Sequence, residues 1–200
     1  MTEKHYFKYG QHETDYLRKR DKKLGSAIDH IGIIKREVQP DVFTALIDSV
    51  IGQQISSKAA DTVCARLRER CNITPKELCA LTREDIQSCG MSMRKAEYIK
   101  NISEAAEYKT VDFDALAQMS DAEVIGALTA IKGIGVWTAE MMLIFSLQRP
   151  NVISYGDLAI RRGMMMLYGL NDLSKERFSR YAKRYSPYGS VASLYLWALS

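Results

Sequence analysis

Two glycines and one aspartate are the residues whose types and spacing best fit chemistry. Gly133 and Gly135 lie within Ile131–Ala139, and glycine backbones permit a hairpin tight enough for amide groups to reach a phosphate. Asp157 follows after a helix-length segment and a proline. Its carboxylate would oppose positive charge that grows on a sugar as a base departs. The pairing predicts chemistry on DNA.

Helix ends are expected to position these residues. The pattern at Ser120–Glu123 is a capping box that starts one helix, and this helix stops at Gly133. A second helix resumes after Gly135 and is expected to bury Trp137 on its apolar stripe. Asp157 starts a third helix, either as an N-cap alone or as a cap that also acts chemically. The hairpin is either an ordinary turn between helices or a phosphate site at the positive end of a helix dipole.

Composition limits the protein class. The chain has 200 residues, of which 46% are hydrophobic, enough for one substantial core or two small lobes. The formal net charge is only +4, but residues 18–23 carry five basic side chains against one acid, and residues 161–184 carry seven against two. Such clusters are typical of a polyanion partner or of a solvated helix face. Helical periodicity recurs along the chain without an alternating strand pattern, which predicts an all-α fold.

Membrane, secretion and metal signals are weak. The chain contains no apolar run of about 18 residues and no apolar segment after its charged start. We therefore expect an intracellular protein, in the cytoplasm or nucleoid of a bacterium or the nucleus of a eukaryote. The four cysteines lack metal-ligand spacing, so we expect reduced, mostly packed thiols and no metal site built from side chains. These are Cys64, Cys71, Cys79 and Cys89.

Several separated motifs resemble one known family. Ile131–Ala139, with Asp157 twenty-two positions beyond Gly135, resembles the helix-hairpin-helix (HhH-GPD) DNA glycosylase superfamily. Its 3-methyladenine DNA glycosylase II branch is similar at Leu46–Ser56, at Gly90-Met91 with Arg94-Lys95-Ala96, and at Ile131–Phe145. The similarity covers about residues 38–200 and implies the compact form that lacks an N-terminal β domain. The implied fold is all-α, with two helical lobes flanking a cleft.

The resemblance also implies an organisation and an activity. Residues 1–200 would form a single glycosylase unit, with an N-terminal helical extension over 1–37, a core over 38–200 and the hairpin motif at about 121–147. The implied activity is that of a monofunctional DNA glycosylase of base excision repair, which hydrolyses the N-glycosidic bond of alkylated purines in duplex DNA by base flipping. Asp157 would stabilise the oxocarbenium-like transition state. Relatives that cut the strand carry a lysine where this chain has Trp137, so no lyase activity is expected.

Two alternative functions stay open. The first is a glycosylase of the same fold that removes a neutral lesion, such as hypoxanthine, uracil or a mispaired base. The second is a helix-hairpin-helix module that binds DNA without catalysis. The resemblance gives no iron–sulfur cluster, because all four cysteines precede residue 90, and no other cofactor, although it allows a monovalent cation on the hairpin carbonyls. We expect a monomer that binds double-stranded DNA containing alkylated bases.

Further site residues follow from the resemblance and from side-chain chemistry. An aromatic wall would attract a cationic base, or these aromatic rings would simply pack; the candidates are Trp137, Tyr155 and Tyr188. Gln54 or Ile55 would fill the gap left by the extruded base, or their turn would only connect helices, with Gln53 and Gln54 bonded to backbone. The methionine runs are expected to pack rather than to bind a base. Phosphates would be bound by the hairpin and two nearby arginines, namely Gly133, Ile134, Gly135, Val136, Thr138, Arg161 and Arg162.

Overall fold

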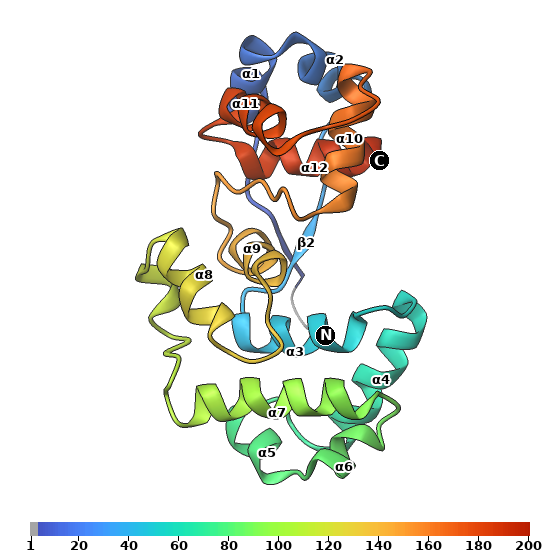
Figure 1. Cartoon of the computed structure of the whole chain (residues 1–200), viewed down its shortest axis with the longest axis vertical. Coiled ribbons are helices and arrows are strands. Elements are labelled where there is room, and N and C mark those ends of the chain that lie inside the picture. The colour runs from blue at the N-terminus through green and yellow to red at the C-terminus, as the bar shows by residue number, and fades with distance from the viewer. Residues whose placement is uncertain (1–3) are drawn as a thin grey trace. The chain divides into compact units, whose positions relative to one another are not determined.

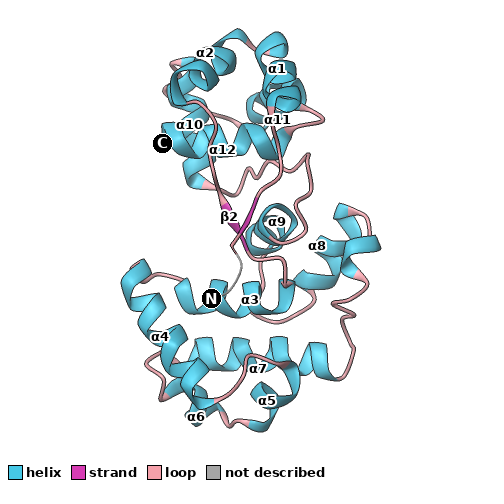
Figure 2. Cartoon of the chain, turned by 180° about the vertical axis from the view of Figure 1, so that it is seen from behind, coloured by secondary structure: helices cyan, strands magenta, loops and turns pink. Residues whose placement is uncertain are grey.

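The computed structural model describes residues 4–200, and helices dominate that range (Figures 1 and 2). Those residues form twelve α-helices, one 3-10 helix and two short strands. Contacts divide the chain into two compact units. The middle unit is Gln39–Met142, and the terminal unit joins the chain up to Val38 with Leu143–Ser200. The predicted all-α fold is confirmed.

The middle unit is built around one long central helix. Helix α7 packs against α3, α5 and α6, and α3 also packs against α4 (Figure 1). Apolar side chains at helical spacing, among them Leu46, Ile47, Ile99 and Ile102, are fully buried there. The elements of this unit are α3 (Val42–Gly52), α4 (Ser57–Arg70), α5 (Pro75–Ala80), α6 (Arg83–Gln87), α7 (Met93–Glu107), η1 (Leu116–Gln118), α8 (Asp121–Thr129) and most of α9 (Val136–Phe145).

The terminal unit is assembled from both ends of the chain. Helix α10 packs closely on α12, and both also contact α2. The Tyr195 hydroxyl of α12 donates to the Gly32 carbonyl at 3.0 Å, so the segment expected as an N-terminal extension is an integral part of this unit. Its elements are β1 (His5–Tyr6), α1 (Gln11–Arg20), α2 (Lys22–Ile31), β2 (Glu37–Val38), α10 (Leu158–Tyr168), α11 (Lys175–Tyr185) and α12 (Gly189–Leu199).

Local cap rules account for most helix ends. The expected capping box forms between Ser120 and Glu123, and Asp157 caps α10. Gly169 ends α10 in the left-handed conformation, as a C-terminal glycine commonly does. Each of these caps involves only residues a few positions apart, so the sequence alone predicts them.

Two features differ from the sequence-based expectations. Strands β1 and β2 pair antiparallel, with His5 opposite Val38 and Tyr6 opposite Glu37 (Figure 2). Two residues per strand are too few to show an alternating pattern, so the pair escaped detection. Trp137 does not lie on the buried stripe of α9, because its side chain is 42% exposed while Met141 is 6% exposed.

Neither a membrane-spanning helix nor a metal-ligand cluster is found among residues 4–200. No helix in this range is both long enough and apolar enough to cross a bilayer. Over the same residues, no three histidine, cysteine or acidic side chains gather in a way that could hold a metal ion. The four cysteines are all unpaired, and each is buried or partly buried.

Candidate active site

Asp157 is a buried carboxylate at the N-terminus of α10. It is 7% exposed, and its Oδ1 atom accepts the Ile160 amide at 2.9 Å. The same oxygen accepts the indole N–H of Trp197 at 3.2 Å. Asp157 therefore caps α10, and the two donors hold its carboxylate in one orientation.

The segment that leads to Asp157 is tied to the start of α12. The Val152 amide donates to Ser190 Oγ at 2.9 Å, and Ser193 Oγ donates to the Val152 carbonyl at 3.2 Å. Both serines are fully buried, so the loop is fixed in position by helix α12. The same helix carries Trp197 at its other end, and it therefore positions Asp157 from two sides.

Trp197 is not among the site residues predicted from the sequence. Its ring lies 5.3 Å, centroid to centroid, from Phe145 at an interplanar angle of 31°, and the Arg36 guanidinium lies 4.9 Å from the Phe145 centroid. A partly buried indole N–H requires an acceptor, and that requirement was the available signal. Arg36 of the N-terminal segment therefore contacts Phe145, whose ring packs on the indole that donates to Asp157.

Tyr155, a predicted base-pocket residue, contacts a cation in this structure. The Arg161 guanidinium lies 5.1 Å from the centre of the Tyr155 ring, and Phe178 packs edge-on against that ring at 5.2 Å. Arg161 Nε is buried and makes no hydrogen bond. Arg161, predicted to bind phosphate, is therefore engaged with an aromatic ring rather than extended into solvent.

Tyr188, the other predicted tyrosine, lies against α1. Its hydroxyl is 2.9 Å from His12 Nε2, and its ring packs edge-on against Tyr16 at 5.2 Å. Tyr188 is the N-cap of α12, nine residues before Trp197, which corresponds to about 13 Å along the helix axis. Tyr188 is therefore engaged with α1 through both its hydroxyl and its ring.

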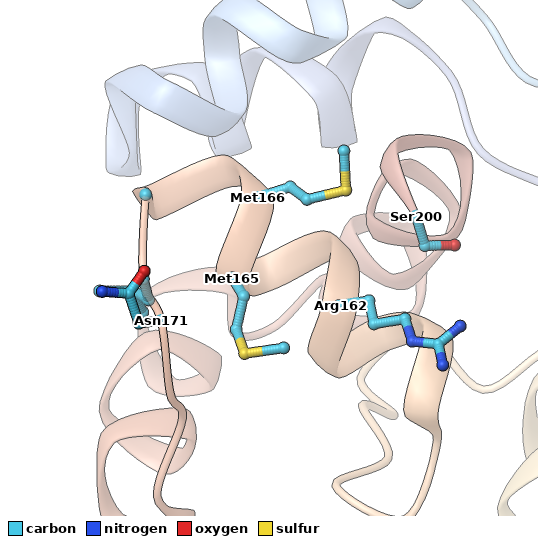
Figure 3. Close-up of a pocket in the computed structure, with 7 residues that line it drawn as sticks. Arg162, Met165, Met166, Asn171 and Ser200 are labelled. Carbon is cyan, nitrogen blue, oxygen red and sulfur yellow. The ribbon is translucent and has the colours of Figure 1, made fainter.

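The methionine run of α10 divides between core and surface. Met164 is fully buried, as expected for packing. Met165 and Met166 instead line an open pocket of about 480 Å³ together with Arg162 and Ser200 (Figure 3). Met166 is 65% exposed, and Arg162 is exposed on the same helix, so this arginine is free to reach a ligand in solvent.

The hairpin joins α8 to α9 in the middle unit. Gly133 has a φ of +106°, and a Cβ atom at this position would overlap the Tyr98 ring, so only glycine fits. Asn101 Nδ2 donates to the Lys132 carbonyl at 3.1 Å, and Lys132 pairs with Glu97 at 2.7 Å. Helix α7 therefore holds the hairpin in its conformation.

The start of α9 is suited to anion binding through its backbone. The Ala139 amide donates to the Gly135 carbonyl at 3.1 Å, so the first turn of α9 begins there and presents the positive end of its dipole. Ile134 and Thr138 are 6% and 4% exposed. A phosphate at this turn would therefore meet their backbone rather than their side chains, whereas Val136 is 55% exposed.

The predicted wedge lies in the turn between α3 and α4. Gln54 has a φ of +57° and an exposed side chain, and Ile55 is 41% exposed. Lys95 Nζ donates to the carbonyls of Ile51 at 2.8 Å and Gln53 at 2.6 Å. These bonds satisfy carbonyl groups at the C-terminal end of α3, and burial lowers the pKa of Lys95 below its usual value.

One cavity connects the hairpin to the turn that carries the predicted wedge, residues 53–56, which we call the wedge turn. It measures about 300 Å³, and Gln54, Tyr98 and Gly133 are among its lining residues, together with Arg94 and Lys95. The predicted wedge and the predicted phosphate site therefore lie side by side in the middle unit. A glycine hairpin between two helices defines a helix-hairpin-helix protein.

Comparison with known proteins specifies the family. The chain matches the HhH-GPD superfamily of base excision DNA repair proteins over residues 47–187 and belongs to it. It is 36% identical over 164 residues to DNA-3-methyladenine glycosylase 1 of Schizosaccharomyces pombe, covering 79% of this chain and 72% of that protein.

Solved structures agree with this assignment. The DNA-3-methyladenine glycosidase of Bacillus halodurans aligns with a TM-score of 0.86 at 36% identity, covering 97% of this chain and 91% of that chain. The S. pombe 3-methyladenine DNA glycosylase in complex with abasic DNA aligns with a TM-score of 0.82 at 31% identity, covering 94% and 95%.

Proposed function

We propose that this protein is a monofunctional DNA glycosylase that removes alkylated purines from duplex DNA. The observation that carries the proposal is the buried Asp157 carboxylate, held by the Ile160 amide and the Trp197 indole. Support for the substrate class comes from the relatives, which are named DNA-3-methyladenine glycosylases. One similar structure was solved with abasic DNA, the product that remains after base removal.

The chemistry of the substrate determines what the protein must supply. Alkylation at N3 of adenine or N7 of guanine places positive charge on the base, which then leaves without being protonated. The remaining demand is stabilisation of the cationic sugar while water attacks the anomeric carbon. A carboxylate about 4 Å from that cation contributes roughly 4 kcal/mol at an effective dielectric of 20, or about a thousandfold in rate.

The other site elements have roles in binding and extrusion. The first turn of α9 would hold a backbone phosphate, which gives affinity without reading sequence. Gln54, or its neighbour Ile55, would enter the gap that the flipped nucleotide leaves. Exposure of both side chains, and the bonds that Lys95 makes to this turn, support this assignment.

Strand cleavage is not part of the proposed activity. A glycosylase that also cuts the strand needs an amine to form a Schiff base. In the family, that lysine occupies the hairpin position where this chain has Trp137, and an indole cannot supply the amine. Trp137 is exposed in the first turn of α9, where its electron-rich ring would favour a cationic base.

The test is release of 7-methylguanine and 3-methyladenine from alkylated duplex DNA by the wild type and by Asp157→Asn. We expect the variant to fall by about a thousandfold or more in rate while keeping most of its DNA affinity, because asparagine still caps α10. The abasic product should remain uncut until alkali is added. Asp41→Asn is the matched control, since Asp41 caps α3 by the same kind of bond and should keep full activity.

Each alternative predicts a different result. Excision of hypoxanthine or uracil without release of methylated purines would replace the alkylpurine proposal with a neutral-lesion glycosylase. Binding of DNA without release of any base, by wild type and variant alike, would leave only a binding module. Amine-dependent strand cleavage would contradict the argument from Trp137.

A further inference from the structure

Two basic segments far apart in the sequence meet in the terminal unit. Arg20, Lys22 and Lys23, at the junction of α1 and α2, share a pocket of about 570 Å³ with Arg184 of α11. All four side chains belong to exposed residues. We call this site the basic pocket. Clusters of this kind are common on solvated helix faces, so the arrangement of the charges decides whether the pocket suits a ligand.

The carboxylate of Asp21, the one acidic group among the described residues that line the basic pocket, accepts hydrogen bonds from neighbouring protein groups. Asp21 is 6% exposed. Its Oδ1 accepts the amides of Lys23 and Leu24 at 3.1 and 3.0 Å, and its Oδ2 accepts the Tyr168 hydroxyl at 2.5 Å and the Arg184 guanidinium at 3.3 Å. This carboxylate stabilises the α2 terminus and the pocket floor, and the surface facing solvent stays strongly positive.

The position of the two lysines works against the folding of α2. Lys22 and Lys23 lie in its first turn, which contains no acidic residue, and cations at a helix N-terminus are unfavourable. Arg20, in the last turn of α1, is by contrast favourably placed. Lys23 also donates to the Tyr168 carbonyl at the end of α10 at 3.3 Å, so the unfavourable placement of Lys22 points most directly to a role in binding an anion.

The aromatic rings in the basic pocket are already engaged. Tyr168 and Tyr181 stack on each other at 3.8 Å with an interplanar angle of 12°. Lys23 Nζ lies 5.7 Å from the Tyr168 centroid and the Arg184 guanidinium 4.8 Å from that of Tyr181. The site therefore offers cations rather than a stacking surface for a base, which suits a phosphate backbone.

The basic pocket lies away from the proposed catalytic carboxylate. Asp157 caps the N-terminal end of α10, and Tyr168 is the last residue of that helix. Eleven residues separate the two ends by about 16 Å, roughly twice the Debye length of about 8 Å at physiological ionic strength. Charges in the basic pocket should therefore affect DNA binding without affecting bond cleavage.

We propose that the basic pocket is a second binding site for the phosphate backbone of duplex DNA, separate from the hairpin and from the Asp157 site. The choice of DNA as the polyanion rests on membership of a DNA repair family and on the proposed function. Since protein–phosphate interactions carry no sequence information, binding at the basic pocket should be independent of sequence and of damage.

The test is the salt dependence of binding to undamaged duplex DNA by wild type and by the double variant Lys22→Gln/Lys23→Gln. Removing one lysine–phosphate interaction should lower the slope of log K against log salt by about 0.9, so the double variant should lower it by about 1.8. The thermal midpoint should change little, because relief of the unfavourable α2 dipole interaction offsets the loss of the bond from Lys23 to the Tyr168 carbonyl at 3.3 Å. The single charge reversal Lys22→Glu should lower affinity at low salt as well.

Lys76→Gln/Lys109→Gln is the matched control, since it removes the same charge from two exposed lysines that do not line the basic pocket. An unchanged slope in the folded pocket variant, or an equal decrease in the control, would overturn the proposal; the first result would also be expected if the pocket bound an acidic protein instead. Base release by the wild type tests the proposed function independently, because the slope is measured on DNA that contains no lesion.

Discussion

A Cβ atom on Gly163 would overlap the backbone carbonyl of Leu196. Gly163 lies on α10 and Leu196 on α12, so the missing side chain sets how closely these two helices approach. That approach places Trp197 next to Asp157. A residue without a side chain thereby contributes to the geometry of the candidate active site.

Gly163→Ala should destabilise the protein, although alanine is the better helix former by about 1 kcal/mol. Forcing a methyl group against backbone typically costs about 1–3 kcal/mol, and any shift of α12 would also slow base release. Urea unfolding and single-turnover kinetics measure both effects. Gly126→Ala in α8 is the control, because its Cβ would meet nothing within 4 Å and the change should stabilise. Equal effects at both positions would contradict the close-packing argument.

Trp197→Phe should keep the aromatic contact with Phe145 while removing the hydrogen bond to Asp157. A hydrogen bond to a charged group contributes about 1.5–3 kcal/mol, so we expect base release to slow by about tenfold or more. Tyr195→Phe is the control, because it removes a hydroxyl on the same helix that donates to the Gly32 carbonyl and not to Asp157. Tyr195→Phe should lower the free energy of unfolding and leave the rate of base release unchanged. A similar loss of rate in both variants would show that the Trp197→Phe effect comes from destabilisation of the fold and not from the bond to Asp157.

Gly133→Ala should distort the hairpin, since its backbone has a positive φ and its Cβ would overlap the Tyr98 ring. We expect weaker binding to undamaged duplex DNA, by about tenfold, together with a lower thermal midpoint. Gly135→Ala is the informative partner, because nothing lies within 4 Å of its Cβ position. Fluorescence anisotropy measures the affinities. Equal losses of affinity in the two variants would show that DNA binding does not depend on the backbone conformation of Gly133.

Lys95→Met should disturb the wedge turn while preserving side-chain length. We expect kcat/KM to fall by about tenfold on alkylated duplex DNA, but little on alkylated single strands, which need no base extrusion. Lys100→Met is the control, because Lys100 donates in the same manner from α7 to the Cys79 carbonyl at 2.6 Å. If Lys100→Met produced the same duplex-specific loss, Lys95 would have no particular part in positioning the turn.

Cys64 should react slowly with alkylating reagents in the native protein. Burial, followed by the nearby Asp48 carboxylate, raises the pKa of Cys64 from 9.0 to about 11, so the nucleophilic thiolate is scarce at pH 8. The reaction should accelerate as pH rises from 9 toward 11. The stabilisation of the folded state that comes from the raised pKa of this thiol is complete below pH 9 and should decline over the same range. Peptide mapping after timed alkylation measures the rate. Unfolded protein should react at the ordinary rate, and equal rates in both states would refute the prediction.

The hairpin, the helix caps and Asp157 could all be predicted from the sequence, because each depends on residues a few positions apart. A glycine with positive φ, an aspartate at a helix start and a capping box act through local backbone geometry. The separated motifs, taken together, indicated the protein family. Short strands of two residues gave no such pattern, and β1 and β2 were missed for that reason.

Tertiary packing alone established the contacts between distant residues. Trp197 lies 40 positions from Asp157, and the Lys22–Lys23 pair lies far from Arg184 in the sequence, so no local rule links them. Trp137 was expected in the core because its spacing fits the apolar stripe, yet the packing of α9 leaves it exposed. Burial depends on which surfaces meet in the folded chain, whereas caps and turns depend only on their neighbours.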